Sequence, residues 1–273
     1  MLDKFHTLSV VHNETDYTPV TREFALDELE LDFTTAPYIY IGHRKPINAV
    51  FFNIIEQEAN NPSITTGEYY NGTEWRPLAD FTDHTRGFYR SGFLKFNRVQ
   101  DGISLYEIAD KTEYWYRFRS EVLLESLKIE GVGLVFSDDI QLQREVPLIT
   151  DVSFLGSRKS HILAHTAARD EIIQKFRNKD YIVRNGGKYR NLEVFDLHDI
   201  DEVRLASVYL ALSKIYLNSS DSPTDTWADK ANLYRDYFNK YINIARLSVD
   251  VNDDGEEQSS ENKPILKNKY ITR

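Results

Sequence analysis

The chain has 273 residues, of which 41% are hydrophobic and 28% are charged, as in an ordinary globular protein with one large or two smaller domains. Its net charge of -10 argues against a protein whose main task is to wrap nucleic acid, and the absence of cysteine excludes disulfides and thiolate metal sites. We expect no signal peptide and no membrane contact, because the N-terminus lacks an apolar core and no apolar run approaches a membrane span.

The first half of the chain has the pattern of short β-strands. Apolar and polar residues alternate, β-branched and aromatic residues are frequent, and turn residues separate the runs. The Asn71-Gly72 pair lies between aromatic residues, which predicts a hairpin with a type I′ turn. We expect strands at residues 8–11, 29–33, 37–41, 47–55, 88–96, 114–119, 122–127, 129–135 and 140–142. This spacing predicts an antiparallel β-sandwich domain over residues 1–150.

The second half changes to helical periodicity. The predicted helices span residues 158–178, 199–217 and 225–247, and their expected N-caps are Ser157, Asp196 or Asp199, and Thr224. Together they predict an α-helical domain over residues 151–249. The fold class is therefore α+β, with an N-terminal antiparallel β-sandwich followed by a C-terminal α-helical bundle and an extended tail.

The tail, residues 250–273, is acidic at its start and basic at its end, and alone it is expected to be disordered. Asp250, Asn252, Asp254 and Glu261 fit positions 1, 3, 5 and 12 of a calcium-binding loop. Glu257 stands where such loops place an apolar residue, so a solvated acidic linker is the favoured interpretation of residues 250–261. Calcium binding stays open as the alternative.

Two groups of side chains raise the question of chemistry. Asp80, Asp83 and His84, with Ser91 nearby, have the residue types of a hydrolytic triad, but no Gly-x-Ser-x-Gly elbow is present. Local turn chemistry, in which Asp83 and Thr85 bind backbone groups, is the favoured interpretation. We therefore expect a protein that is not an enzyme.

His161 and His165 are spaced four residues apart on a predicted helix, which allows both rings to hold one metal ion. Ile162 stands where zinc proteases carry glutamate, so that pattern is absent. A packed or surface pair is the simpler interpretation. We expect no cofactor and no metal.

Aromatic residues in the β domain offer a different use. Trp75, Tyr89, Trp115 and Tyr116 are candidates for stacking against sugars, as in a carbohydrate-binding module. The alternative is that these side chains belong to the core or to contacts between subunits.

The region from residue 75 to residue 119 carries a recognisable pattern. A tryptophan is followed by D-x-T-x-x-F-x-x-S-G, an apolar strand and Y-W-Y-R. This pattern resembles a β-sandwich module of tailed-bacteriophage baseplate and neck proteins. We define the sandwich signature as Trp75, Asp83, Thr85, Phe88, Gly92, Trp115 and Arg117. The predicted helices and the charged tail resemble head-to-tail adaptor proteins, which form the ring beneath the phage portal.

The resemblance implies a structural virion protein, made in the bacterial host cytoplasm and located in the neck below the capsid. It implies a dodecameric ring of identical subunits that joins the portal to the next neck or tail-completion protein and lines the channel through which DNA only passes. The tail would then bind the portal protein through Pro264, Ile265, Leu266, Lys267, Lys269, Tyr270 and Arg273. A baseplate or tail-terminator component of the same virion is the first alternative, and a carbohydrate-binding module is the second.

Overall fold

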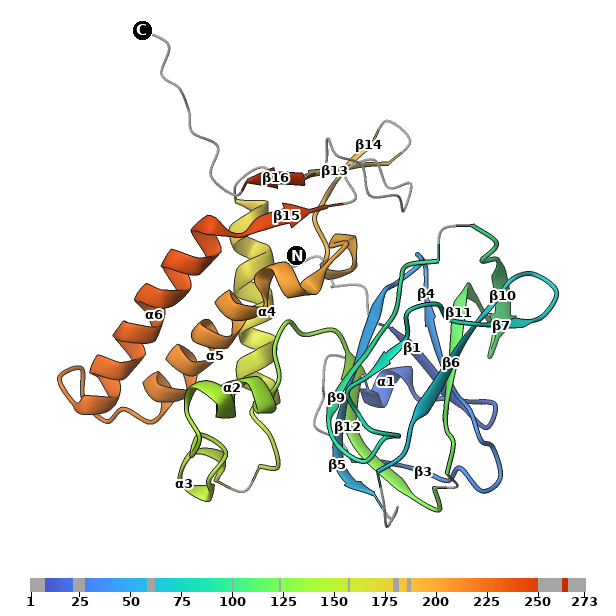
Figure 1. The fold of residues 1–273 in the computed structure, drawn as a ribbon, viewed down its shortest axis with the longest axis horizontal. Helices are drawn as coiled ribbons and strands as arrows, with labels where there is room; N and C mark the ends of the chain where they lie inside the picture. The colour runs from blue at the N-terminus through green and yellow to red at the C-terminus, as the bar shows by residue number, and fades with distance from the viewer. Residues whose placement is uncertain are drawn as a thin grey trace, which may run out of the picture. The chain divides into compact units, whose positions relative to one another are not determined.

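The computed structural model describes residues 8–21, 28–57, 62–99, 101–122, 124–156, 158–178, 182–185, 188–249 and 262–264. The chain divides into two compact units, Met1–Leu134 and Val135–Arg273 (Figure 1). The first is built from two antiparallel sheets and the second from helices, so the predicted α+β class is confirmed.

The division falls before residue 150 because one predicted strand is wrong. Residues 140–142 lie inside a helix, α2 (Asp139–Glu145). Asp138 and Gln141 form a reciprocal capping box at its start, which satisfies the first free amides of the helix. The alternating apolar residues that suggested a strand are too few to override this cap.

The larger sheet of the β unit has seven strands, with order β2-β1-β4-β11-β6-β7 and β10 beside β11. These strands are β1 (Ser9–His12), β2 (Thr15–Asp16), β4 (Ile39–His43), β6 (Thr65–Tyr70), β7 (Trp75–Pro77), β10 (Leu105–Ile108) and β11 (Lys111–Ser120). Every pair is antiparallel, and β11 lies between β4 and β6 in the middle of the sheet.

The smaller sheet has five strands in the order β3-β12-β5-β9-β8. These are β3 (Leu29–Leu31), β5 (Ala49–Gln57), β8 (Thr82–Asp83), β9 (Gly92–Lys95) and β12 (Leu127–Gly133), and a short helix α1 (Thr18–Thr21) also belongs to this unit. Inward-facing aromatic side chains of the two sheets meet: the ring centroids of Phe52 and Phe118 are 6.5 Å apart, and those of Phe96 and Tyr116 are 5.2 Å apart. The predicted sandwich core is therefore present.

The predicted hairpin at Asn71-Gly72 exists, but its loop is longer than expected. β6 and β7 are joined by four residues, and only Gly72 has a positive φ, 99°. The Asn71 side-chain oxygen accepts hydrogen bonds from the backbone N–H groups of Thr73 and Glu74. An Asx-type loop thus replaces the type I′ turn.

Two other predicted strands need correction. Residues 88–91 form a turn, so the strand expected at residues 88–96 is only β9. The strand expected at residues 122–127 is not formed in the described part of that segment, because Val122 is exposed and β12 begins at Leu127.

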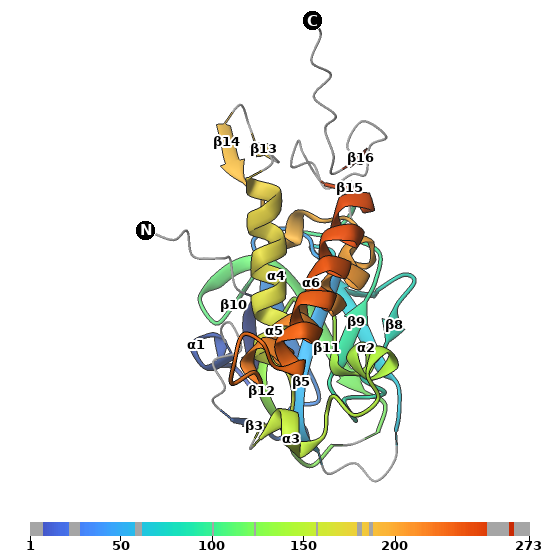
Figure 2. The same ribbon diagram turned by 90° about the vertical axis from the view of Figure 1, so that its left-hand side faces the viewer.

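The helical unit contains all three predicted helices. They are α4 (Ile162–Arg177), α5 (Arg204–Asn218) and α6 (Thr226–Ile244). α5 packs against both α4 and α6 (Figure 2). Leu210 and Leu212 of α5, Phe176 of α4, and Phe238 and Ile242 of α6 are fully buried and form the core.

Smaller elements complete the helical unit. They are α3 (Val152–Leu155), the 3₁₀ turns η2 (Val194–Asp196) and η3 (Ile200–Val203), the hairpin of β13 (Ile182–Asn185) with β14 (Lys188–Asn191), and the pair of β15 (Arg246–Ser248) with β16 (Asn262–Pro264).

The helix starts differ from the predictions. Asp199 caps the turn η3 by accepting from the Asp201 N–H, so α5 begins only at Arg204. Asp225, and not Thr224, caps α6 and accepts from the Ala228 N–H at 2.7 Å. Ser157, the expected cap of α4, lies outside the described residues.

Candidate functional site

The Asp83 carboxylate is the centre of the sandwich signature. Its Oδ1 accepts hydrogen bonds from Thr85 N–H and Oγ1, both at 2.6 Å, and from Arg86 N–H at 3.0 Å. Its Oδ2 accepts from Gly87 N–H at 2.7 Å and from Thr65 N–H at 2.8 Å. Five donors therefore surround one carboxylate, and they fix the turn after β8. The prediction that Asp83 and Thr85 hold a turn is confirmed.

This turn places one aromatic ring in the core. The Thr85 hydroxyl accepts a hydrogen bond from Phe88 N–H at 3.0 Å, and Phe88 has a positive φ of 63°. Its ring is fully buried, 5.1 Å from that of Phe52 and 6.0 Å from that of Phe33. A positive φ at a bulky residue costs free energy, which the buried ring contacts offset.

The residues that suggested a triad do not form one. The Ser91 hydroxyl donates to the Ile54 carbonyl at 2.9 Å and accepts from the Ile54 N–H at 2.8 Å, so it satisfies the backbone of β5. Gly92 passes so close to the backbone of His84 that a Cβ there would lie 2.8 Å from the His84 carbonyl oxygen. Ser91 therefore bonds the backbone of a neighbouring strand, and Gly92 permits a close backbone approach.

The remaining signature residues lie on β7 and β11. The Arg117 guanidinium lies 4.2 Å from the ring centroid of Tyr38 and 4.6 Å from that of Trp75, and its Nε donates to Glu68 at 2.6 Å. The rings of Tyr40 and Tyr70 contact the edge or face of Trp75, each at a centroid distance of 5.6 Å. All of these rings are half-exposed. We call Tyr38, Tyr40, Tyr70, Trp75 and Arg117 the aromatic–arginine cluster.

The four residues proposed for sugar stacking differ in burial. Trp115 is fully buried, and its indole N–H donates to the Tyr106 carbonyl at 2.9 Å. Tyr116 is also fully buried, and burial raises the pKa of its hydroxyl. Neither can meet a ligand, whereas Trp75 and Tyr89 remain accessible. The core interpretation therefore holds for two of the four.

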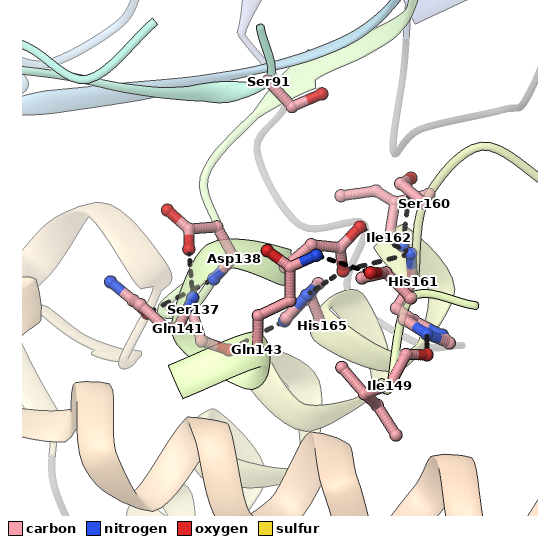
Figure 3. A network of polar contacts seen from close by, with 12 residues as sticks. Ser91, Ser137, Asp138, Gln141, Gln143, Ile149, Ser160, His161, Ile162 and His165 are labelled. Atoms are coloured by element: carbon pink, nitrogen blue, oxygen red, sulfur yellow. Dashed lines mark hydrogen bonds and ion pairs between the residues drawn. The ribbon is translucent and has the colours of Figure 1, made fainter. Parts of the chain in front are cut away.

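The helical unit contains a serine–histidine–aspartate array that the sequence did not suggest (Figure 3). His165 Nδ1 lies 2.8 Å from Ser137 Oγ, and His165 Nε2 lies 3.0 Å from Asp139 Oδ1. Ser137 Oγ also lies 2.8 Å from Ser207 Oγ. Both serines are fully buried, so no substrate reaches either hydroxyl. The array therefore connects the start of α2 with α4 and α5.

Asp139 joins both histidines to this array. It accepts from the His161 backbone N–H, while the His161 ring Nε2 donates to the Ile149 carbonyl at 2.8 Å. Burial raises the pKa of Asp139, but the hydrogen bond from His165 and the nearby histidines outweigh it and hold that pKa below its usual range. Burial lowers the pKa of His161. The rings of His161 and His165 thus bind different protein groups. They form a packed pair, as the simpler interpretation expected.

Aromatic residues also join α5 to α6. The ring of Tyr216 stacks between those of Trp227 and Tyr234, with centroid distances of 5.6 Å to each. Tyr209 stacks on the other side of Tyr234 at 6.1 Å. Burial and the nearby Glu145 carboxylate raise the pKa of Tyr209 to about 12. This column of rings fixes the α5–α6 hairpin.

The helical unit exposes a set of large apolar side chains. Those that are more than a third exposed are Leu148, Leu205, Leu217, Trp227, Leu233, Tyr237 and Ile244. On α6, Leu233, Tyr237 and Ile244 are exposed by 47%, 39% and 66%, and their spacing places them on one side of the helix. The half-exposed Tyr241 lies between them. We call Leu233, Tyr237, Tyr241 and Ile244 the α6 stripe.

Most of the predicted portal-binding residues cannot be placed. Pro264 is the last residue of β16, opposite Arg246 of β15. Ile265, Leu266, Lys267, Lys269, Tyr270 and Arg273 lie outside the described residues, as do the candidate calcium ligands in residues 250–261. Over the described ranges, no group of three or more His, Asp or Glu side chains could hold a metal ion. Among the helices that the structure describes, none is long and apolar enough to cross a membrane.

Comparisons with known proteins identify no relative in sequence. No family model matches the chain, and no curated protein matches it. One solved structure with some similarity is CpGH89CBM32-6 of Clostridium perfringens, with 16% identity, a TM-score of 0.29, and coverage of 49% of this chain and 94% of that chain. Another is CpGH89 of the same organism in complex with GlcNAc-alpha-1,4-galactose, with 10% identity, a TM-score of 0.28, and coverage of 63% of this chain and 19% of that chain. Both TM-scores are too low to assign a family or a function.

Proposed function

We propose that the chain is a structural subunit of a tailed-phage virion, in the head-to-tail adaptor ring that joins the portal to the tail and lines the DNA exit channel. The proposal rests first on the resemblance of the sandwich signature to phage baseplate and neck modules. Asp83 and Ser91, which look reactive, are used to build the module, since the Asp83 carboxylate and the Ser91 hydroxyl bind backbone groups. Such a module is a scaffold for assembly.

The observation that carries the proposal is the exposed apolar surface of the helical unit. Large side chains such as Leu217 and Ile244 are exposed by 61% and 66%. Ring subunits need two surfaces that meet head to tail, and the exposed apolar side chains of the helical unit are available for such contacts. The serine–histidine–aspartate array described above is buried, so its polar groups are used within the helical unit.

Deletion of residues 251–273 tests the portal contact. We expect the shortened chain to stay folded by circular dichroism and to lose binding to a portal protein from the same genome in pull-down and size-exclusion assays. A full-length chain with Asn268→Ser serves as the matched control, because it keeps β16 and changes a tail residue outside the predicted portal-binding set. Portal binding that survives the deletion would refute the role of the tail.

A baseplate or tail-terminator subunit of the same virion uses the same module and the same exposed surfaces. The neighbours of the chain in an assembled particle distinguish the two positions. Contact with the portal favours the adaptor ring, and contact only with tail proteins favours the alternative.

A carbohydrate-binding module is a second candidate because the aromatic–arginine cluster leaves Trp75 accessible beside Arg117. Half-exposed rings offer flat apolar surfaces on which a sugar ring can stack. A glycan array with the full chain, Trp75→Ala and the control Val122→Ala, an exposed residue of the β unit outside the stacking candidates, tests this candidate. Binding lost only in Trp75→Ala favours it, and absence of binding to every glycan excludes it.

A further inference from the structure

The aromatic–arginine cluster lies on the outer face of the larger sheet. Its residues come from β4, β11, β6 and β7, which are neighbours in that sheet, and from the segment just before β4 (Figure 1). Along β11, Tyr116 and Phe118 are fully buried in the core, so Arg117 and Arg119, which alternate with them, point to the outer face. The register places Arg119 opposite Thr66 of β6.

A row of aromatic rings crosses this face. The ring centroid of Tyr70 lies 4.2 Å from that of Tyr106 and 5.6 Å from that of Trp75. The Trp75 ring in turn lies 5.6 Å from that of Tyr40. Tyr40, Tyr70 and Trp75 are half-buried and Tyr106 is exposed, so part of each ring remains open to a ligand. Such rings can stack against the apolar C–H side of a sugar ring.

Two arginines of this face already have acidic partners. Arg117 Nε donates to Glu68 at 2.6 Å, and Arg76 of β7 forms an ion pair with Glu74. Each positive charge is thus balanced by a carboxylate on the same sheet.

Arg119 differs from these two arginines. Its Nε donates to the Thr66 hydroxyl at 3.4 Å, and its guanidinium lies 5.4 Å from the ring centroid of Tyr38. Among the residues that the structure describes, no carboxylate pairs with it, and its side chain is exposed. A guanidinium has five donors in a planar fork that matches a carboxylate. Arg119 is therefore the cation of this face that is available to an anion.

We propose that the aromatic–arginine cluster, together with Arg119, binds a sugar residue that carries one carboxylate, as uronic and sialic acids do. Trp75 and the adjacent tyrosines bind the sugar ring, and the Arg119 guanidinium holds the carboxylate through two parallel N–H···O hydrogen bonds. This inference rests on the carbohydrate-binding candidate and names its ligand class. It does not depend on the virion role.

The number of available charges favours this ligand over other anions. A single-stranded nucleic acid also stacks on aromatic rings, but it binds along a positively charged groove, whereas this face offers one unbalanced arginine on a chain of net charge -10. An acidic peptide uses the charge and has no need of the row of rings. One carboxylate on a sugar ring uses both features.

Isothermal titration calorimetry of the full chain tests the proposal with two acidic probes and their neutral counterparts. The pairs are sialyllactose with lactose, and a trisaccharide of galacturonic acid with one of galactose. We expect at least one acidic probe to bind about fivefold or more tightly than its neutral counterpart at low salt, which also identifies the acid. This preference should decrease as the salt concentration rises, because the Arg119 contact is exposed.

Three variants separate charge from stacking. Arg119→Gln should remove the preference and leave the affinity for the neutral probe unchanged, whereas Arg119→Lys keeps the charge without the fork and should retain part of the preference. Trp75→Ala should weaken binding of acidic and neutral probes alike. Arg86→Gln, at an exposed arginine of the β unit outside the cluster, is the matched control and should behave as the unchanged chain.

The possible failures are distinguishable. Equal affinity for acidic and neutral probes, or a preference that survives Arg119→Gln, would overturn this inference and leave the carbohydrate-binding candidate standing. Acidic-probe binding that survives Trp75→Ala would assign the contact to charge alone, as for an acidic peptide, and would also overturn it. Absence of binding to all four probes would overturn both the inference and the candidate function.

Discussion

Replacement of Asp83 by alanine removes the acceptor that holds the turn between β8 and β9. Five hydrogen bonds are lost, and the N–H of Thr65 and the hydroxyl of Thr85 are left in a buried environment. A hydrogen bond to a charged acceptor contributes about 1.5–3 kcal/mol, and the contributions around one carboxylate do not add. We therefore expect the free energy of unfolding of the β unit to fall by about 3–5 kcal/mol.

Urea unfolding followed by tryptophan fluorescence measures this change. A Trp227→Phe background leaves Trp75 and Trp115 as reporters, and both belong to the β unit. Asp101→Ala in the same background is the control, because Asp101 is an exposed turn residue whose loss should change stability by no more than about 0.5 kcal/mol. Asp83→Asn keeps one acceptor oxygen and should fall between the two.

A loss below about 1 kcal/mol in Asp83→Ala would refute the reasoning, because a carboxylate with five donors would then contribute no more than an exposed side chain. The same result would reopen a functional role for Asp83.

Two further predictions concern other buried contacts. Gly92→Ala places a Cβ against the His84 backbone and should destabilise the β unit by about 2–4 kcal/mol. Gly102→Ala meets no atom within 4 Å, and its positive φ of 80° alone should cost about 1–2 kcal/mol, so equal effects of the two changes in urea unfolding would contradict the contact at Gly92. Burial lowers the pKa of the His161 ring from its usual 6.5. As the pH falls below 6.5, the unfolded chain therefore binds a proton at His161 before the folded chain does. The free energy of unfolding is unaffected by His161 above pH 6.5 and decreases as the pH falls toward the lower pKa of the folded chain. His161→Gln should flatten this part of the pH profile of helical-unit stability, and an unchanged profile would contradict the assignment.

The sequence predicted those parts of the fold that depend on local pattern. Alternation located most strands, including β4 and β11, and the 3.6-residue period located α4 and α6. The segment at residues 88–91 was misjudged because the carboxylate of Asp83 and not the apolar pattern decides its backbone. No element was predicted between residues 178 and 199, so the hairpin of β13 with β14 was missed.

In the candidate sites, too, contacts between residues close in sequence could be predicted and contacts between distant residues could not. Asp83 and Thr85 could be assigned to a turn because their partners are close in sequence. The array of Ser137, His165 and Ser207 could not, because its hydrogen bonds join residues 28 and 70 positions apart. Burial, which decided between stacking site and core for Trp115, is likewise a property of the folded chain.

Electron microscopy of the purified chain, alone and with a portal protein from the same genome, tests the central claim most directly. The account predicts a closed ring of identical subunits on the portal, with the C-terminal segment in contact with portal residues. A chain that remains monomeric at high concentration, forms no ring with the portal and binds no other virion protein would contradict the proposed role.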